Sequence, residues 1–191
     1  MAIAQELSAE TGARGSPPLL FLTDPARTPD PAAIAARLPP GAGVIYRHFG
    51  APERREVAAA LAAICRARGL ALLIAGDPAL AAAVDAAGVH WPERLIPPRR
   101  AGFALETGAA HCARGIAQAA RAGLDAALLS PVFASRSASA GRPLGLFRAA
   151  GLAQRAGLPV YALGGVGART GRRLLGLGFA GIAAVGALAK A

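Results

Sequence analysis

Paired glycines end one apolar stretch near the C-terminal end of the chain, and small residues end the next stretch. Gly164 and Gly165 follow the first, and Val185 and Gly186 close the second. Glycines at such places let a ligand approach backbone N–H groups, and neighbouring N–H groups bind phosphate. The alternative is that Gly164-Gly165 only form a tight strand exit. Because two successive stretches share the feature, the sequence predicts a phosphate site here.

A serine-containing loop precedes these stretches and is a candidate for the same site. Ser135 and Ser137 flank Arg136, so the loop offers two hydroxyl donors and a cation to a phosphate. A polar loop without a ligand is the alternative interpretation, since residues 134–141 are rich in Ser, Ala and Gly. A bulky residue at Gly165 is expected to abolish phosphate binding with little loss of fold, because the site would lie on a loop.

Other polar side chains follow apolar stretches along the chain, and these include all three histidines. The positions are Thr23, Asp24, Arg47, His48, Asp77, His90, Glu93, Glu106, His111 and Ser130. Three imidazoles can hold zinc with an open coordination position, so a His48–His90–His111 metal site is one alternative. Each histidine comes from a different stretch, however, and their spacing does not favour that site over solvated or capping roles.

Eight apolar stretches alternate with Ala-, Leu- and Arg-rich segments of helical character. Continuous apolar strands covered by helices are typical of a parallel sheet, and eight repeats favour a single (β/α)8 TIM barrel, an α/β fold. We expect residues 1–18 to be an irregular, flexible leader, residues 19–191 to form the barrel, Pro92–Ala101 to make a poor helix, and the last helix to be short or missing. The expected strands are Leu19–Thr23, Gly43–His48, Leu70–Ala75, Gly88–Trp91, Gly102–Leu105, Ala126–Phe133, Pro159–Leu163 and Gly181–Val185.

The composition of the chain excludes several classes of protein. The 191 residues are 54% hydrophobic, which excludes disorder, and no run is long and apolar enough to suggest a membrane span. The net charge is +10, yet no basic run is interleaved with aromatic residues, so we expect no nucleic-acid partner. The only cysteines, Cys65 and Cys112, fit neither a disulfide framework nor zinc spacing, so a reduced cytoplasmic location is expected.

At several motifs the sequence resembles the thiamine phosphate synthase/TenI family of (β/α)8 barrels, over residues 19–188. The block from Ser130 to Ser137, followed by Leu144-Gly145-Leu146 and Gly164-Gly165, is the most specific part of the resemblance. The other matching pieces are Phe21-Leu22-Thr23-Asp24, Arg47, Gly88-Val89-His90, His111 and Gly181–Leu188.

The resemblance implies a transferase of thiamine biosynthesis, which joins a thiazole phosphate to hydroxymethylpyrimidine diphosphate and releases pyrophosphate with the help of Mg2+. It implies catalytic roles for Arg47, which would contact the pyrophosphate, and for Asp77 and His111. It places the thiazole phosphate at Ser135, Ser137, Gly164, Gly165, Val185 and Gly186, and a weak metal site at Asp77 and Glu93. Small phosphorylated thiazole and pyrimidine substrates are the partners that the resemblance implies. Apart from the resemblance, we expect no membrane partner, and a homodimer is the assembly considered.

The sequence departs from the family pattern on the pyrophosphate and metal side. The lysine of an Arg-x-Lys motif is replaced by Phe49, an Asn-Asp pair reads Gly76-Asp77, and the acidic residue after Gly-Val-His has only Glu93, two residues early. Another lysine position is Ala138. A barrel that binds thiamine phosphate or its thiazole phosphate precursor without catalysis, or with altered activity, is therefore the alternative function. The tautomerase branch uses a histidine where this chain has Pro131.

Overall fold

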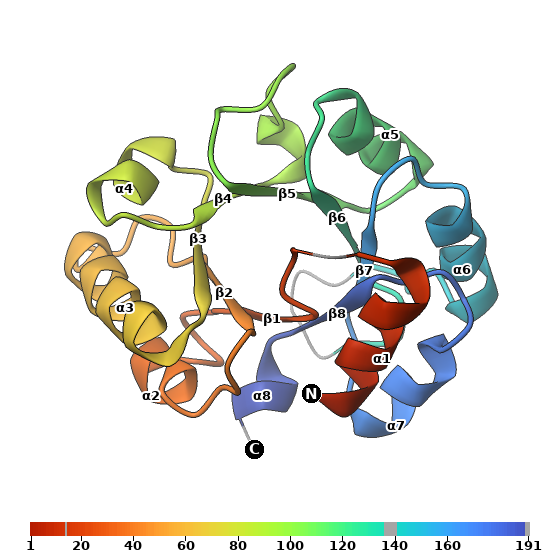
Figure 1. Cartoon of the computed structure of the whole chain (residues 1–191), viewed down its shortest axis with the longest axis horizontal. Coiled ribbons are helices and arrows are strands. Elements are labelled where there is room, and N and C mark those ends of the chain that lie inside the picture. The colour runs from red at the N-terminus through yellow and green to blue at the C-terminus, as the bar shows by residue number, and fades with distance from the viewer. Residues whose placement is uncertain (14, 136–140, 190–191) are drawn as a thin grey trace.

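Eight parallel strands close into a barrel in chain order, with β1 paired to both β2 and β8 (Figure 1). The computed structural model describes residues 1–13, 15–135 and 141–189. The closed sheet confirms the predicted (β/α)8 fold. The strands are β1 (Leu19–Leu22), β2 (Gly43–Tyr46), β3 (Ala71–Ala75), β4 (Gly88–Trp91), β5 (Leu105–Ala110), β6 (Ala126–Leu129), β7 (Val160–Leu163) and β8 (Gly181–Ala184).

Helices surround this barrel on its outer side (Figure 1). None in the described ranges is long and apolar enough to cross a membrane. The last helix, α8, is only four residues long, as expected. The helical segments are α1 (Ala2–Thr11), α2 (Pro31–Ala35), α3 (Arg54–Arg68), α4 (Pro78–Ala83), η1 (Glu93–Leu95), α5 (Ala113–Arg121), α6 (Leu146–Gln154), α7 (Ala168–Gly171), η2 (Arg172–Leu174) and α8 (Gly186–Ala189).

Strand residues divide between two apolar layers, because successive side chains point to opposite faces of a sheet. Leu20, Leu22 and Ile45 belong to a cluster built of strand and strand-end residues, which fills the barrel interior. Phe21 and Val44 belong to the larger cluster that the strands share with the surrounding helices. The two packed layers fix the strand ends, and the strand ends carry the candidate site.

The first residues of the chain are not irregular over residues 2–11, which corrects that part of the expected leader. They form α1, which packs against β8 with Ala4 and Leu7 buried. The carboxylate of Glu10 also accepts a hydrogen bond from the backbone N–H of Gly176 at 2.9 Å. Figure 1 shows α1 beside β8, next to α7.

Strand β5 begins where the sequence analysis expected a strand to end, so the expected strand Gly102–Leu105 is wrong. Glu106 is fully buried at the start of β5, and its carboxylate accepts hydrogen bonds from the N–H groups of Ala101, Gly102 and Phe103. Burial opposes its ionisation, but these bonds and one from Trp91 outweigh that effect and hold the pKa of Glu106 below its ordinary value. Glu106 therefore organises the loop before β5 and does not lie at the functional rim.

Candidate functional site

A cavity of about 1000 Å³ opens at the end of the barrel where the strands finish. Its walls come from the residues that follow β1, β2, β4, β5, β6, β7 and β8. Active sites of such barrels lie at this face, and the volume is at the upper end of small-molecule sites. A smaller hollow of about 530 Å³, beside α3 and α4, is lined by none of the predicted site residues.

Seven of the predicted site residues meet in this cavity. Because the ends of parallel strands gather at one edge of the sheet, residues far apart in the sequence become neighbours here. Ser137 lies outside the described residues. The residues brought together are Arg47, His111, Ser135, Gly164, Gly165, Val185 and Gly186.

Asp77 does not line the cavity. Its carboxylate caps the start of α4, where Oδ1 accepts a hydrogen bond from the backbone N–H of Leu80 at 2.9 Å. Oδ2 lies 3.9 Å from Nε of Arg54. An aspartate followed by Pro78 at the first helical position is a common helix start, so the sequence carried a signal for this capping role.

Glu93 is likewise turned to a helix start rather than to the cavity lining. Its Oε2 accepts a hydrogen bond from the backbone N–H of His111 at 2.9 Å and lies 3.9 Å from Nε2 of the same residue. The carboxylate also packs closely against Gly115 of α5. Asp77 thus caps α4, whereas Glu93 binds the backbone just before α5, and the two carboxylates serve different elements.

The donor set of the cavity does not fit a magnesium ion held by the protein. Mg2+ is bound through carboxylate oxygens, and no Asp or Glu is among the described residues that line the cavity. Within the described ranges, no three His, Cys, Asp or Glu side chains come together as a metal site, so the zinc alternative is wrong.

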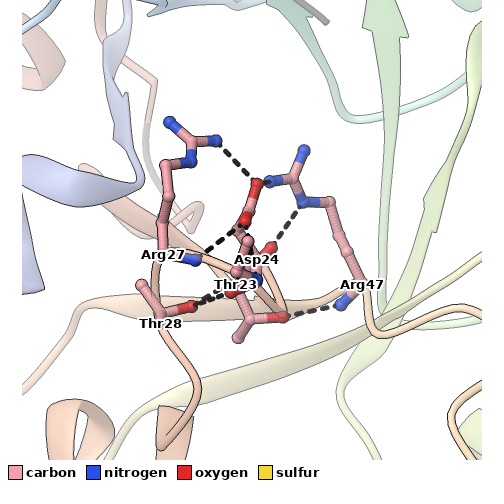
Figure 2. A network of polar contacts seen from close by, with 6 residues as sticks. Thr23, Asp24, Arg27, Thr28 and Arg47 are labelled. Atoms are coloured by element: carbon pink, nitrogen blue, oxygen red, sulfur yellow. Dashed lines mark hydrogen bonds and ion pairs between the residues drawn. The ribbon is translucent and has the colours of Figure 1, made fainter. Parts of the chain in front are cut away.

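Arg47 is held by the residues that follow β1 (Figure 2). Its backbone N–H donates to Oγ1 of Thr23 and its Nε donates to the carbonyl oxygen of Thr23, both at 2.8 Å. Its Nη2 lies 3.8 Å from Oδ2 of Asp24. Burial lowers the pKa of Arg47, while the nearby Asp24 carboxylate opposes that shift. The Nε bond therefore holds the guanidinium at the mouth, and the other bond fixes the backbone of Arg47.

Asp24 also binds a second arginine, which the sequence analysis missed. Arg27 donates from Nη2 to Oδ2 of Asp24 at 2.8 Å, and its backbone N–H donates to Oδ1 at 3.0 Å. The side-chain hydrogen bond from Arg27 is the main reason why the pKa of Asp24 is below its ordinary value. Both Arg27 and Arg142 line the cavity, but with 20 arginines spread along the chain nothing singled them out.

The three histidines have different environments. His90 lines the cavity and is buried, and its Nδ1 lies 2.9 Å from Oγ1 of Thr107. Burial lowers the pKa of His90 to about 3, and the charge of Arg47 acts in the same direction. His90 is therefore neutral at pH 7 and adds no charge to the cavity.

His111 is exposed at the cavity wall, and its Nδ1 lies 2.9 Å from the carbonyl oxygen of Ser130. A bond of this kind leaves Nε2 on the other side of the ring, toward the Glu93 carboxylate. His48, in contrast, is buried behind β2, where its ring lies 5.0 Å from that of Tyr46. Burial lowers the pKa of His48.

At the opposite wall, the β7 exit packs directly on the loop that follows β6. Gly164 and Gly165 have φ angles of 91° and 65°, and a Cβ atom on Gly165 would collide with Phe133 and the carbonyl oxygen of Ala134. Both glycines are thus required by close packing, which the sequence analysis did not foresee. A bulky residue at Gly165 must disturb the fold.

Backbone N–H groups remain available at this wall. Those of Gly165 and Val166, after β7, donate no hydrogen bond to any described residue. The same holds for the N–H groups of Gly186 and Ala187 after β8. All four residues line the cavity together with Ser135. Adjacent N–H groups and a hydroxyl are suitable donors for a phosphate dianion.

Comparisons with known proteins match this chain to one family. A family model described as thiamine monophosphate synthase matches residues 19–188. Thiamine-phosphate synthase of Chloroflexus aurantiacus is 32% identical over 168 residues, which is 84% of this chain and 78% of that protein. Putative thiamine-phosphate synthase 2 of Aquifex aeolicus is 36% identical over 91 residues, so the match spans about half of each chain, 46% and 49%.

Among solved structures, a thiamine phosphate pyrophosphorylase from Pyrococcus furiosus has the same fold. It superposes with a TM-score of 0.75 and 23% sequence identity, over 87% of this chain and 84% of that one.

Proposed function

The chain belongs to the thiamine monophosphate synthase family, and we propose that it acts in thiamine biosynthesis as a transferase, in the cytoplasm. In the proposed reaction, a thiazole phosphate and hydroxymethylpyrimidine diphosphate both bind in the cavity at the strand ends. The thiazole nitrogen forms a bond to the pyrimidine methylene carbon, and the C–O bond to the diphosphate breaks, so pyrophosphate leaves with the electron pair.

One observation carries this proposal. The N–H groups after β7 and β8 and the guanidinium of Arg47 lie in the lining of the same cavity. We assign the thiazole phosphate to the wall with Ser135, Gly165 and Gly186, because this wall presents N–H and hydroxyl donors. The diphosphate belongs to the opposite wall, where Arg47 can stabilise the charge that develops on the leaving group. The two substrates then meet between the walls.

Several other residues contribute to the shape of the site without adding charge. His90 is neutral and buried, so it contributes shape and a hydrogen-bonding ring nitrogen rather than charge. Phe49 and Pro92 line the cavity near Arg47 and offer apolar surface to a heterocycle. In the proposed site, His111 contacts substrate from the cavity wall and Asp77 positions α4 through its cap.

Synthase activity is the direct test. Purified protein is incubated with both substrates, and thiamine phosphate and pyrophosphate are measured by chromatography. We expect the native chain to form thiamine phosphate and pyrophosphate in equal amounts. Arg121→Ala, which removes an exposed arginine on α5, should form them at the native rate. Arg47→Ala should lower the rate by about tenfold or more, since a charge-assisted contact to the leaving group is lost.

A second candidate function is binding without catalysis. It is favoured by the absence of Asp and Glu from the described cavity lining, since Asp77 caps α4 and Glu93 binds the backbone N–H of His111. The same experiment separates the two functions. If calorimetry detects binding of the thiazole phosphate while no thiamine phosphate forms at high protein concentration, the barrel is a binding protein. If neither is observed, both candidates are rejected.

A further inference from the structure

Two arginines that line the cavity, from neighbouring strand exits, share the carboxylate of Asp24, which is not itself among the lining residues. In Figure 2 the carboxylate of Asp24 lies between the guanidinium groups of Arg27 and Arg47. The distances to Oδ2 of Asp24 are 2.8 Å from Nη2 of Arg27 and 3.8 Å from Nη2 of Arg47. Both arginines line the cavity, so the group carries a net charge of +1 at the mouth.

The segment that holds this pair is tied together by hydrogen bonds. Oγ1 of Thr28, which is 1% exposed, accepts from the backbone N–H of Asp24 at 2.7 Å and donates to the Asp24 carbonyl oxygen at 2.9 Å. Thr23 is fully buried and anchors Arg47 twice. Preorganised guanidinium groups lose little entropy when they bind a ligand. The wall is therefore built to keep two cations in place.

The Nη end of Arg47 has hydrogen-bonding capacity left for a ligand, since its only contact with Asp24 is an ion pair of 3.8 Å from Nη2 to Oδ2. Its Nε is bonded to Thr23, but neither of its Nη atoms makes a hydrogen bond to a described residue. Its side chain is 27% exposed and that of Arg27 is 30% exposed, so both are partly desolvated yet reachable from the cavity. A planar guanidinium presents a fork of N–H donors that matches phosphate oxygens.

The same wall has lost the groups that the family resemblance would place there. Phe49, at the position of the family's lysine, lines the cavity and stacks with the guanidinium of Arg54 at 5.2 Å from its ring centre. Asp24 supplies the carboxylate beside Arg27 and Arg47, and its Oδ1 already accepts from the backbone N–H groups of Ala26 and Arg27. Its oxygens are thus occupied by arginine and backbone donors.

We propose that Arg27 and Arg47, held together by Asp24, form an anion clamp that binds a phosphate group of the substrate directly, with no divalent cation. The inference deepens the proposed function and rests on it only for the identity of the anion, the diphosphate of the pyrimidine substrate. Arg27 supplies the second cation of this wall, which in the family is the lysine at the Phe49 position. His90, which also lines the cavity, is neutral and adds no charge to the clamp.

Calorimetry with inorganic pyrophosphate, in buffer that contains EDTA, tests the clamp without requiring catalysis. We expect pyrophosphate to bind the native protein, and the affinity to change less than about threefold when Mg2+ replaces EDTA. Arg27→Ala should weaken binding about tenfold or more, as a charge-assisted hydrogen bond is lost, and Arg27→Lys should fall between the two. Arg121→Ala, the matched control on α5, should bind as the native protein does.

The outcomes distinguish failure of the clamp from failure of the proposed function. The clamp is overturned if pyrophosphate binding requires Mg2+, or if Arg27→Ala binds pyrophosphate as tightly as Arg121→Ala. A parallel titration with the thiazole phosphate reports on the opposite wall and should be the same for Arg27→Ala and the native protein. If pyrophosphate binds without metal but the thiazole phosphate does not bind, the clamp stands and the proposed function fails.

Discussion

The chain has two tyrosines, both buried, and their hydroxyl groups differ in hydrogen bonding. The Tyr161 hydroxyl donates to the carbonyl oxygen of Pro17 at 2.9 Å, whereas that of Tyr46 has no partner among the described residues. Burial raises the pKa of Tyr161 to about 12 and also raises that of Tyr46. A buried hydroxyl without a partner costs free energy, and one with a partner contributes to stability.

Replacement of each tyrosine by phenylalanine should therefore have different effects. We expect Tyr161→Phe to lower the free energy of unfolding by about 1 kcal/mol, because the bond from the hydroxyl to the carbonyl oxygen of Pro17 is lost. Tyr46→Phe should leave the free energy of unfolding unchanged or raise it by about 1 kcal/mol. Urea unfolding followed by circular dichroism measures both. An equal loss in the two variants would mean that the Tyr46 hydroxyl has a bound partner, such as an ordered water.

Gly165 and Gly186 both line the phosphate wall, but only one of them is required by packing. Gly165 has positive φ and contacts the β6 loop, whereas a Cβ on Gly186 would meet no atom within 4 Å. Gly165→Val should destabilise the fold by about 2 kcal/mol or more, since strain and overlap add. Gly186→Val should keep the fold and reduce binding of the thiazole phosphate by crowding the wall.

Thermal unfolding and calorimetry on both glycine variants separate packing from ligand contact. Native-like affinity of Gly186→Val for the thiazole phosphate would place the phosphate elsewhere in the cavity. Native-like stability of Gly165→Val would show that the β6 loop can move away from β7.

Among the elements, α1 makes the least expected contribution to the core. Leu7 is fully buried, while Leu95 of η1 is 55% exposed. Leu7→Ala should lower the free energy of unfolding by about 2 to 4 kcal/mol, because it leaves a cavity between α1 and β8. Leu95→Ala is the matched control and should change it by about 0.5 kcal/mol or less. Equal small losses, measured in urea, would mean that α1 separates from the barrel in solution.

Most strands were predictable because parallel strands buried on both sides appear as continuous apolar runs. β4 lies at the expected residues, and β1, β7 and β8 differ by one residue at one end. β5 was missed since its buried polar residues, Glu106 and Thr107, interrupt the apolar pattern and are satisfied by distant partners. The helix α1 was missed because nothing in its Ala-rich sequence indicates that it would pack against β8.

The candidate site was predictable where its residues directly follow a strand. Arg47, Gly165 and Gly186 follow their strands closely, so strand order alone placed them at one face. Asp77 and Glu93 also follow strands, but their carboxylates accept backbone N–H groups instead, that of Leu80 in α4 and that of His111 before α5. Which way a short side chain turns depends on the local backbone N–H groups. Strand order does not specify this.

At the scale of the whole molecule, buried histidines link stability to pH. An unfolded histidine takes up a proton near pH 6.5, but His90 in the barrel stays neutral down to about pH 3. Between these values the unfolded state binds more protons, so the free energy of unfolding decreases as the pH falls. From pH 7.5 to 5.0 we expect His90 to account for a loss of about 2 kcal/mol, and His48 to add to it.

Urea unfolding at the two pH values measures this loss. His90→Asn removes the titrating group and can keep a hydrogen bond to Thr107, so its free energy of unfolding should depend less on pH than that of the native protein. Asp24 and Glu106 have lowered pKa values and lose their stabilising effect only at more acidic pH. The same pH slope in His90→Asn and the native protein would contradict the assignment.

The described cavity lining holds three arginines and no acidic residue, and the whole chain has a net charge of +10. This excess of positive charge affects how binding must be measured. Small anions of the medium, such as chloride, sulfate or inorganic phosphate, will concentrate at this mouth and compete with any charged metabolite. Apparent affinities will then decrease as ionic strength rises. In phosphate buffer, the measured affinity of a ligand would include the cost of displacing bound phosphate from the cavity. Affinities measured with different buffer anions are therefore expected to differ.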